Sequence, residues 1–220
     1  SENNSVILTD VRCLSLPLTL DCGEAFRWQL EDDGSWSGAA FGKYLNIKEE
    51  NGSFVLKNTT LNDFESVWRG YFDLDRDYAA ICEQLKQDDL LCETIDEYYG
   101  IRILNQDPWE ALVSFVISQQ NNIKRIKGII KRICDTYGKP ICPGWNSFPN
   151  AQTLSSCTVE DLEALGLGYR AKYVKRLADD VAAGVIDLAK IKAMDLESAK
   201  KALLSIYGVG EKVANCALLF

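Results

Sequence analysis

The sequence of 220 residues contains no histidine. Because imidazole is absent, Ser–His and Cys–His nucleophilic pairs, histidine metal sites and acid–base catalysis by histidine are excluded. The eight cysteines form no C-x-x-C pair and no close cluster, which argues against a zinc ribbon, a thioredoxin-type site or an iron–sulfur centre. No apolar run approaches the roughly 20 residues of a membrane-spanning helix. The chemistry must therefore rest on carboxylates, lysine, tyrosine or cysteine.

The composition is that of a globular protein, with 47% apolar and 25% charged residues. A chain of this length can bury a core without disulfide or metal staples. The first residues show neither the basic nor the apolar region of a secretory signal, so we expect an intracellular protein with no membrane association. Reduced thiols are therefore favoured, and four disulfides are the alternative that the even cysteine count leaves open.

Charge is distributed unevenly along the chain, whose net charge is −8. Residues 1–100 carry a net charge of −12, whereas residues 101–220 carry +4. Two segments concentrate the positive charge: 120–140, with Lys124, Arg125, Lys127, Lys131, Arg132 and Lys139 against Asp135, and 166–176, with Arg170, Lys172, Lys175 and Arg176. This asymmetry indicates either a polyanionic partner or two solvated helix faces, and charge alone does not decide between them.

The first sixty residues predict an antiparallel sheet. Short segments rich in aromatic and branched residues indicate strands over 5–8, 26–30, 35–41, 44–48 and 54–57. Asn51-Gly52 indicates a tight hairpin between the last two strands. One face of such a meander is expected to pack on helices.

From residue 60 onward the pattern is helical. We expect helices over 60–71, 76–87, 88–98, from Pro108 onward, over a segment with Ile123, Ile126, Ile130, Ile133 and Tyr137 on one stripe, and over 169–183, 195–206 and 211–220. Asp107 and Thr158 are expected to cap helices, with capping-box starts at both. The prolines of 140–149 indicate a loop. The fold class is therefore α+β, with an antiparallel domain and its following helices over 1–100 and a helical domain over 101–220.

The most specific segment is a helix, a tight turn and a second helix over residues 203–219. Gly208 and Gly210 flank Val209 in the turn, so the backbone can approach a phosphate closely. The second helix begins there and directs free N–H groups outward, which makes an anion site. This is the helix–hairpin–helix pattern that binds DNA backbone without reading sequence. The alternative is an ordinary turn between core helices.

Lys212 lies in the first turn of the second helix, against the positive end of the helix dipole. A cation is disfavoured there, which makes this amine a candidate nucleophile. Cys216 and Phe220 follow at spacings of four, on the same helix face. An amine, a thiol and an aromatic ring in a row could line a pocket for a flat purine. By spacing alone, a core role for Cys216 and Phe220 with a solvated Lys212 is favoured over such a pocket.

Four ordered motifs resemble the 8-oxoguanine DNA glycosylase/AP lyases of the helix–hairpin–helix superfamily, over nearly the whole chain. They are GEAFRW at 23–28, DPWE through SFVISQQNNIKRI at 107–126, LGLGYRAKY at 165–173 and GVGEKVANC at 208–216. The resemblance implies a TBP-like N-terminal antiparallel sheet domain packed on a mostly helical glycosylase core. It also implies base-excision repair of 8-oxoguanine in duplex DNA, with flipping of the lesion out of the helix.

The resemblance assigns catalysis and base recognition to three residues, to which the shared helix face adds Phe220. Lys212 matches the nucleophile that attacks the sugar C1′ and forms a Schiff base, which then permits β-elimination. Gly23 matches the glycine whose carbonyl senses the N7–H of 8-oxoguanine. Cys216 matches the residue that stacks on the flipped base, and Phe220 extends that face.

The resemblance assigns contacts with the duplex to a second set of residues. Gln120 matches the residue that fills the gap in the duplex, with Asn121 and Asn122 as its neighbours. Arg125 and Arg170 match the arginines that hold the orphaned cytosine, and Tyr169 matches the wedge beside it. Gly208 and Gly210 match the hairpin that contacts phosphate. The carbonyls of Leu204, Ile206 and Val209 match positions that can hold a structural cation, and no cofactor is expected for catalysis.

The sequence departs from the family pattern at two points. The family carries an aspartate in a PVD-type segment shortly after the hairpin helix, and the sequence given stops at Phe220 before that segment, so the helical domain is expected to be truncated at its C-terminus. Glu24 stands where the family more usually has glutamine.

The interpretation is a bifunctional DNA N-glycosylase and abasic-site lyase, acting as a monomer on double-stranded DNA that contains oxidised guanine. Three rival interpretations remain. One is a monofunctional alkylation-type glycosylase of the same superfamily, which uses water and against which Lys212 argues. The second is a DNA-binding module or lesion sensor without catalysis, which the absent aspartate leaves open. The third is a purely structural helical domain, against which the basic second half and the hairpin argue.

Overall fold

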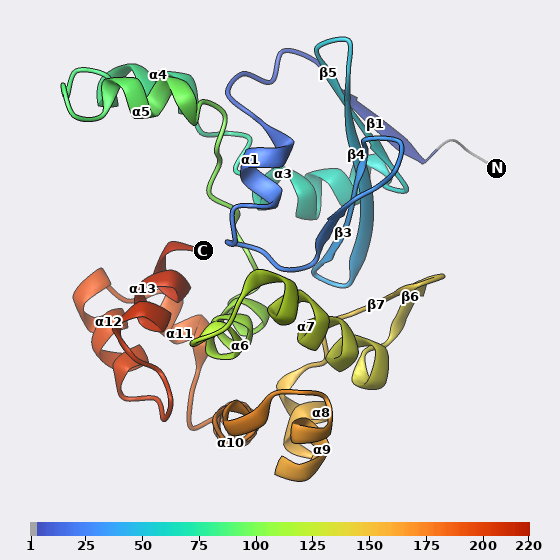
Figure 1. The fold of residues 1–220 in the computed structure, drawn as a ribbon, viewed down its shortest axis with the longest axis vertical. Helices are drawn as coiled ribbons and strands as arrows, with labels where there is room; N and C mark the ends of the chain where they lie inside the picture. Colours follow the sequence, from blue (N-terminus) through green and yellow to red (C-terminus); the bar gives the residue numbers. More distant parts are fainter. Residues whose placement is uncertain (1–3) are drawn as a thin grey trace. The chain divides into compact units, whose positions relative to one another are not determined.

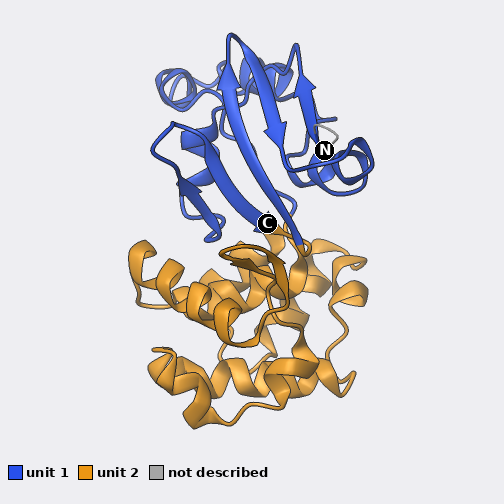
Figure 2. Ribbon diagram, turned by 90° about the vertical axis from the view of Figure 1, so that its right-hand side faces the viewer, with its two compact units in different colours: residues 1–39, 43–105 blue, residues 40–42, 106–220 orange. Residues whose placement is uncertain are grey.

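The computed structural model describes residues 4–220, which divide into two compact units. The first unit comprises residues up to 39 together with 43–105, and the second comprises 40–42 and 106–220 (Figure 2). Within residues 4–220, no helix is long and apolar enough to cross a membrane. The two units are described separately.

The first unit is built on a five-stranded antiparallel sheet, as the sequence predicts (Figure 1). Its strands are β1 (Ser5–Leu8), β2 (Trp28–Leu30), β3 (Trp36–Ala40), β4 (Lys43–Glu50) and β5 (Ser53–Lys57), in the order β1-β5-β4-β3-β2. Asn51 and Gly52 both have positive φ, at 51° and 77°, which is the geometry of the predicted tight hairpin. The N-terminal strand β1 pairs with β5, from Ser5 opposite Lys57 to Leu8 opposite Phe54.

The first unit also contains short helical segments. They are α1 (Leu16–Leu20), α2 (Leu61–Asp63), a π-helical turn η1 (Phe64–Trp68), α3 (Arg69–Tyr71), α4 (Tyr78–Leu85) and α5 (Cys92–Glu97). The helices α1 and α3 lie beside the sheet, whereas α4 and α5 lie away from it (Figure 1). The core is aromatic: Trp28 contacts Trp68, Tyr71 and Phe72 with ring centroids about 6 Å apart. The Trp28 indole N–H donates to the Tyr71 hydroxyl at 2.8 Å, so the buried polar atom is satisfied.

Arg102 anchors the segment at the end of the first unit. Its buried guanidinium donates to the carbonyls of Cys13, Asp73 and Arg12 at 2.7–2.9 Å and lies 4.5 Å from the centre of the Tyr78 ring. Burial lowers the pKa of this guanidinium, yet three charge-assisted hydrogen bonds offset the desolvation. The segment around Arg102 is thereby fixed to the loop of Arg12 and Cys13 and to the loop of Asp73.

The second unit is helical. Its helices are α6 (Pro108–Ser118), α7 (Ile123–Tyr137), α8 (Ala151–Ser155), α9 (Val159–Ala164), the 3₁₀ turn η2 (Gly168–Arg170), α10 (Ala171–Ala182), α11 (Leu188–Lys192), α12 (Leu196–Leu204) and α13 (Glu211–Leu219). Two short strands, β6 (Pro140–Cys142) and β7 (Trp145–Asn146), form a hairpin between α7 and α8. The α+β class is confirmed.

Local capping signals are confirmed with one difference. Thr158 and Asp161 form a full capping box at α9. Asp107 caps α6 by accepting the N–H groups of Trp109 and Glu110 at 3.0 and 2.9 Å, but without a reciprocal box. On α7 the buried stripe includes Ile126, Ile130 and Ile133 as expected.

Some elements differ from the sequence-based expectation. The helices α1, α8 and α11, each of five residues, were not expected, and neither was the β6–β7 hairpin in the proline-containing loop. Segments this short carry too few residues to show a period. Ile123, expected on the apolar stripe of α7, is 41% exposed because it starts the helix.

Candidate active site and nucleic-acid interface

The hairpin between α12 and α13 holds its two glycines for different reasons. Gly208 has a φ of +85°, and a Cβ there would lie 2.5 Å from the Cγ atom of Tyr173. Gly210 has a φ of −99° and serves as N-cap of α13, with nothing within 4 Å of where its Cβ would be. Gly208 is therefore required by the fold, whereas the surface at Gly210 is open to an approaching molecule.

The N-terminus of α13 offers unpaired backbone donors. The N-cap Gly210 has no side chain to accept the first N–H groups, and its carbonyl accepts the N–H of Ala214 at 2.9 Å, which starts the helical ladder. The first N–H groups of a helix have no intrahelical partner. Together with the helix dipole, they form a site for an anion such as a phosphate.

Lys212 is exposed in the first turn of α13. Its neighbour Glu211 forms an ion pair with Lys200 of α12 at 2.8 Å, which ties the two helices of the hairpin together. Burial raises the pKa of the Cys216 thiol, and the nearby Lys212 charge lowers it by less. Burial therefore disfavours the thiolate, the form in which a cysteine is nucleophilic.

Phe220 packs against α6. Its ring stacks on Phe115 with centroids 5.6 Å apart and planes 19° from parallel, and its carbonyl accepts the N–H of Gln106 at 2.9 Å. The structure thus brings Lys212 near Cys216 and seats Phe220 on Phe115. The role of Cys216 and Phe220 in base recognition stays a prediction.

The loop between α6 and α7 presents Gln120 in a strained conformation. This exposed residue has a φ of +46°, in a region that non-glycine residues rarely adopt. Asn122 caps α7 by accepting the N–H of Arg125 at 2.9 Å. Asn121 donates to the Ile117 carbonyl and accepts the Asn122 N–H. Both asparagines therefore hold the loop, and Gln120 is the side chain it projects; strained residues of this kind concentrate at functional sites.

Gln119 was not singled out from the sequence, yet it joins three segments of this unit. Its side-chain amide donates to the Gly208 carbonyl of the hairpin at 2.9 Å, and its own carbonyl accepts from Arg170. No signal in the sequence marks it, because the contact spans 89 positions. The one available clue is that Gln119 directly precedes Gln120 in the motif that resembles the family.

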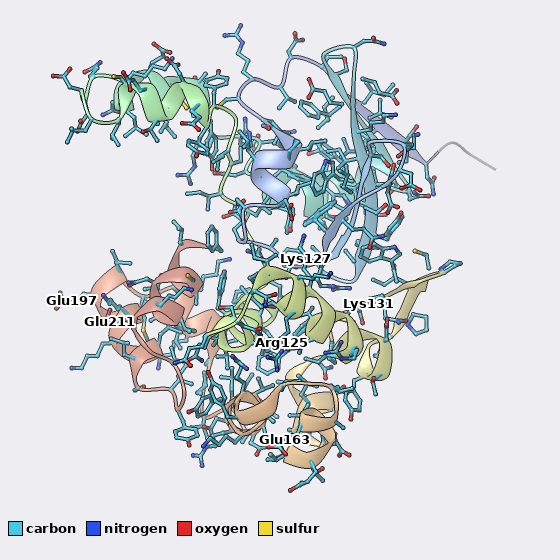
Figure 3. The ribbon with its side chains drawn as sticks, viewed as in Figure 1. Arg125, Lys127, Lys131, Glu163, Glu197 and Glu211 are labelled. Atoms are coloured by element: carbon cyan, nitrogen blue, oxygen red, sulfur yellow. The ribbon has the colours of Figure 1, made fainter. Side chains whose placement is uncertain are left out.

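Tyr169 and Arg170 adjoin the same loop. The Arg170 guanidinium is buried and donates to the carbonyls of Gln119, Gln120 and Leu167. The Tyr169 ring is exposed and lies 4.5 Å from that guanidinium carbon. Arg125, by contrast, is exposed at the first turn of α7 (Figure 3), and its guanidinium forms no hydrogen bond within residues 4–220. The two arginines that the resemblance pairs therefore stand in different environments.

Intrahelical carboxylates neutralise several residues of the two basic segments. Lys131 pairs with Asp135, Lys175 with Asp179 and Arg176 with Asp180, all at 2.6–2.7 Å and four residues apart. The segment 166–176 itself holds no acidic residue, because Asp179 and Asp180 lie just beyond it; the i to i+4 spacing in the sequence could have revealed these partners. Lys124 and Arg125 form no ion pair within the described chain, and they lead the basic face of α7.

Gly23 and Glu24 belong to the first unit, after α1. Gly23 has a φ of +92°, which favours glycine. Glu24 is 3% exposed, and its carboxylate accepts the Leu104 N–H at 3.4 Å. Burial raises the pKa of this carboxyl from 4.5 to about 7, while hydrogen bonds from Leu104 and Cys22 lower it by less.

A structural cation at the hairpin remains a prediction. The Ile206 carbonyl accepts the Val209 N–H at 3.0 Å, which leaves one lone pair on that oxygen for another partner. Within residues 4–220, no group of three His, Cys, Asp or Glu residues could hold a metal ion. A cation would therefore rest on the backbone carbonyls of Leu204, Ile206 and Val209. No disulfide joins the eight cysteines, all of which lie within residues 4–220.

Two family models match this chain in succession. The model described as 8-oxoguanine DNA glycosylase, N-terminal domain, matches residues 6–112, and that of the HhH-GPD superfamily of base excision DNA repair proteins matches 113–214. The Clostridium acetobutylicum 8-oxoguanine glycosylase/lyase, solved with double-stranded DNA containing cytosine opposite 8-oxoguanine, is 37% identical and has a TM-score of 0.96. The match covers all of this chain and 77% of that one. This chain belongs to the 8-oxoguanine DNA glycosylase family.

Two curated relatives extend the comparison within the 8-oxoguanine DNA glycosylase family. The N-glycosylase/DNA lyase OGG1 of Arabidopsis thaliana is 28% identical over 94% of this chain and 60% of its own length. The N-glycosylase/DNA lyase of Saccharomyces cerevisiae is 38% identical over 54% of this chain and 36% of its own length. The chain thus spans no more than 60% of the length of these two relatives.

Proposed function

We propose that this chain carries the base-excision activity of its family: removal of 8-oxoguanine from duplex DNA by Lys212, followed by cleavage at the abasic site. The observation that carries the proposal is Lys212, exposed in the first turn of α13 directly after the open backbone at Gly210. A phosphate bound at the start of that helix would bring a deoxyribose within reach of the amine.

The chemistry follows from an amine at this place. The neutral Lys212 amine attacks C1′ of the lesion nucleotide, and the C1′–N9 bond breaks with its electron pair leaving on the base, which takes up a proton. The amine loses a proton, and the C1′–O4′ bond of the resulting aminal then breaks as O4′ takes up a proton, which opens the sugar ring and forms an iminium ion. The iminium ion acidifies the C2′ hydrogen, so loss of that proton breaks the C3′–O bond by β-elimination and the phosphate leaves with the electron pair. A covalent intermediate of this kind splits one difficult displacement into two easier steps.

The loop of Gln120 and the ring of Tyr169 support the duplex side of the proposal. Both side chains are exposed within one unit, and both adjoin the Gln119 carbonyl. We assign Gln120 to the gap left by the flipped nucleotide and Tyr169 to the adjacent wedge, with Arg125 facing the orphaned cytosine. Extruding a base costs a few kcal/mol, which side chains inserted in its place offset. Gly23 is assigned to sensing N7–H, and Cys216 and Phe220 to the base itself.

Two rival functions make different predictions about Lys212. An alkylation-type glycosylase activates water and forms no covalent bond with DNA, and a non-catalytic lesion sensor forms none either. A lysine at the first turn of α13 is unnecessary for both. Covalent capture therefore separates the proposed function from both rivals.

The test is borohydride trapping of the protein on duplexes that contain 8-oxoguanine or an abasic site. Lys212→Gln is expected to abolish the trapped species while retaining duplex affinity, because the helix N-terminus is unchanged. Lys201→Gln removes another exposed lysine, on α12, and is the matched control, expected to trap as the wild type does. Equal trapping by Lys212→Gln and wild type would contradict the proposal.

A further inference from the structure

Gln119 has both of its side-chain donors engaged by backbone carbonyls. The amide donates to the Val116 carbonyl of α6 at 3.2 Å and to the Gly208 carbonyl of the hairpin at 2.9 Å. The first contact fixes the side chain against its own helix. The second reaches the turn that precedes Lys212 by four residues.

The main-chain carbonyl of Gln119 is a second point of attachment. It accepts hydrogen bonds from the Arg170 guanidinium and from the Tyr169 hydroxyl, the latter at 3.4 Å. Arg170 also donates to the Gln120 carbonyl at 3.1 Å. One residue thus links the loop that projects Gln120, the turn that carries Tyr169, and the hairpin.

Gly208 is held from two sides. The Tyr173 ring fills the space that a side chain on Gly208 would need. The same ring packs edge to face against the Tyr207 ring, with the two ring centroids 5.1 Å apart. The Gln119 amide binds the carbonyl of the same glycine. A peptide clamped between a ring and a hydrogen-bond donor has little freedom to rotate, and the start of α13 follows directly from it.

We propose that Gln119 is a positioning residue, whose amide keeps the hairpin that carries Lys212 in register with the duplex-probing loop. The inference rests on the proposed function. In that function Gln120 and Tyr169 contact the distorted duplex while the Lys212 amine attacks the sugar, and Gln119 would hold these two parts of the site at a fixed distance. It goes beyond the motif residues, because Gln119 touches neither base nor sugar in this assignment. Small displacements of a reacting group reduce rates by about 10- to 100-fold.

The first experiment measures hydrogen exchange of the hairpin amides, residues 206–212, in the absence of DNA. Gln119→Leu removes both donors at similar size and is expected to accelerate exchange there by about 5-fold, the equivalent of one net hydrogen bond. Gln152→Leu, on an exposed position of α8, is the matched control and should leave these amides unchanged. Unchanged exchange in Gln119→Leu overturns the coupling, whatever the protein's activity.

The second experiment separates positioning from binding. Under single-turnover conditions with saturating protein, Gln119→Leu and the isosteric Gln119→Glu should release 8-oxoguanine about 10-fold more slowly or worse, with affinity for undamaged duplex within about twofold of wild type. Gln119→Glu presents a carboxylate to the Gly208 carbonyl, so it should lose at least as much as Gln119→Leu. A wild-type rate in either variant, or parallel loss of rate and affinity, overturns the inference. If the wild type itself releases no base and traps no DNA, the proposed function has failed, and the exchange result still decides the role of Gln119.

Discussion

The ring of Tyr173 occupies the place that a side chain on Gly208 would need, with its Cγ atom 2.5 Å from the ideal Cβ position. Gly208→Ala therefore meets both a steric clash and a φ of +85° that alanine adopts at a cost. We expect this variant to lower the free energy of unfolding by about 2–4 kcal/mol. Gly210→Ala, where the space is open, should lower it by less than about 1 kcal/mol. Urea unfolding of both variants measures the difference, and equal effects would show that the clash is relieved elsewhere.

Glu24 makes a prediction about pH. Its carboxyl has a folded-state pKa of about 7 against 4.5 when unfolded, so between these values the folded chain binds more protons than the unfolded chain. Stability contributed by the protonated group is fully present below pH 4.5 and is lost as pH rises through 7. Glu24→Gln should therefore be more stable than wild type at pH 8, by up to about 3 kcal/mol, and no more stable at pH 4.5. The measurement is the melting temperature of both proteins across this pH range. A difference between the two melting temperatures that stays the same at every pH would contradict the prediction.

Salt dependence should separate the two basic segments. Lys124 is exposed at the start of α7 without an ion pair within residues 4–220, so Lys124→Gln is expected to flatten the slope of log K against log salt by about 1 for duplex DNA. Arg176 already pairs with Asp180 at 2.7 Å, so Arg176→Gln should change the slope little. Binding titrations of undamaged duplex between 50 and 200 mM salt provide the measurement. Equal slopes for wild type and both variants would count against a basic face on α7.

Arg125 is expected to distinguish the base opposite the lesion. An unpaired cytosine presents acceptors at O2 and N3, whereas adenine presents an amino donor, and a buried donor left without a partner costs about 1–3 kcal/mol. Cytosine should thus be preferred over adenine by roughly 5- to 150-fold. Arg125→Ala should lose this preference more than it loses affinity, as measured by single-turnover excision opposite each of the four bases. Equal loss opposite all four bases would instead assign Arg125 to phosphate.

The predictable parts of the fold are those that local chemistry determines. The strands, the Asn51-Gly52 hairpin and the caps at Asp107 and Thr158 each depend on a few adjacent residues, and the structure confirms them. The five-residue helices were missed because a single turn shows no periodicity. The site residues other than Gln119 came from motifs, and their roles remain predictions.

The missed features of the site depend on contacts between distant positions. The burial of Arg170 and the amide of Gln119 reaching Gly208 follow from how helices pack, which no window of sequence reveals. The pKa of Glu24 is likewise raised because the folded chain buries this carboxyl, whereas the sequence shows only that glutamate replaces the more usual glutamine of the motif. Tertiary desolvation, and not residue type, sets its protonation.

The π-helical turn at Phe64–Trp68 has a consequence for how this chain can change in evolution. A π turn holds one more residue than an α turn, so the register of Trp68 and everything after it depends on that extra residue. Deleting a single residue there would restore an ordinary helix but rotate the following side chains by about 100°. Trp68, fully buried beside Trp28, would then leave the aromatic core. Substitutions in this turn are therefore easier to accommodate than a change in its length.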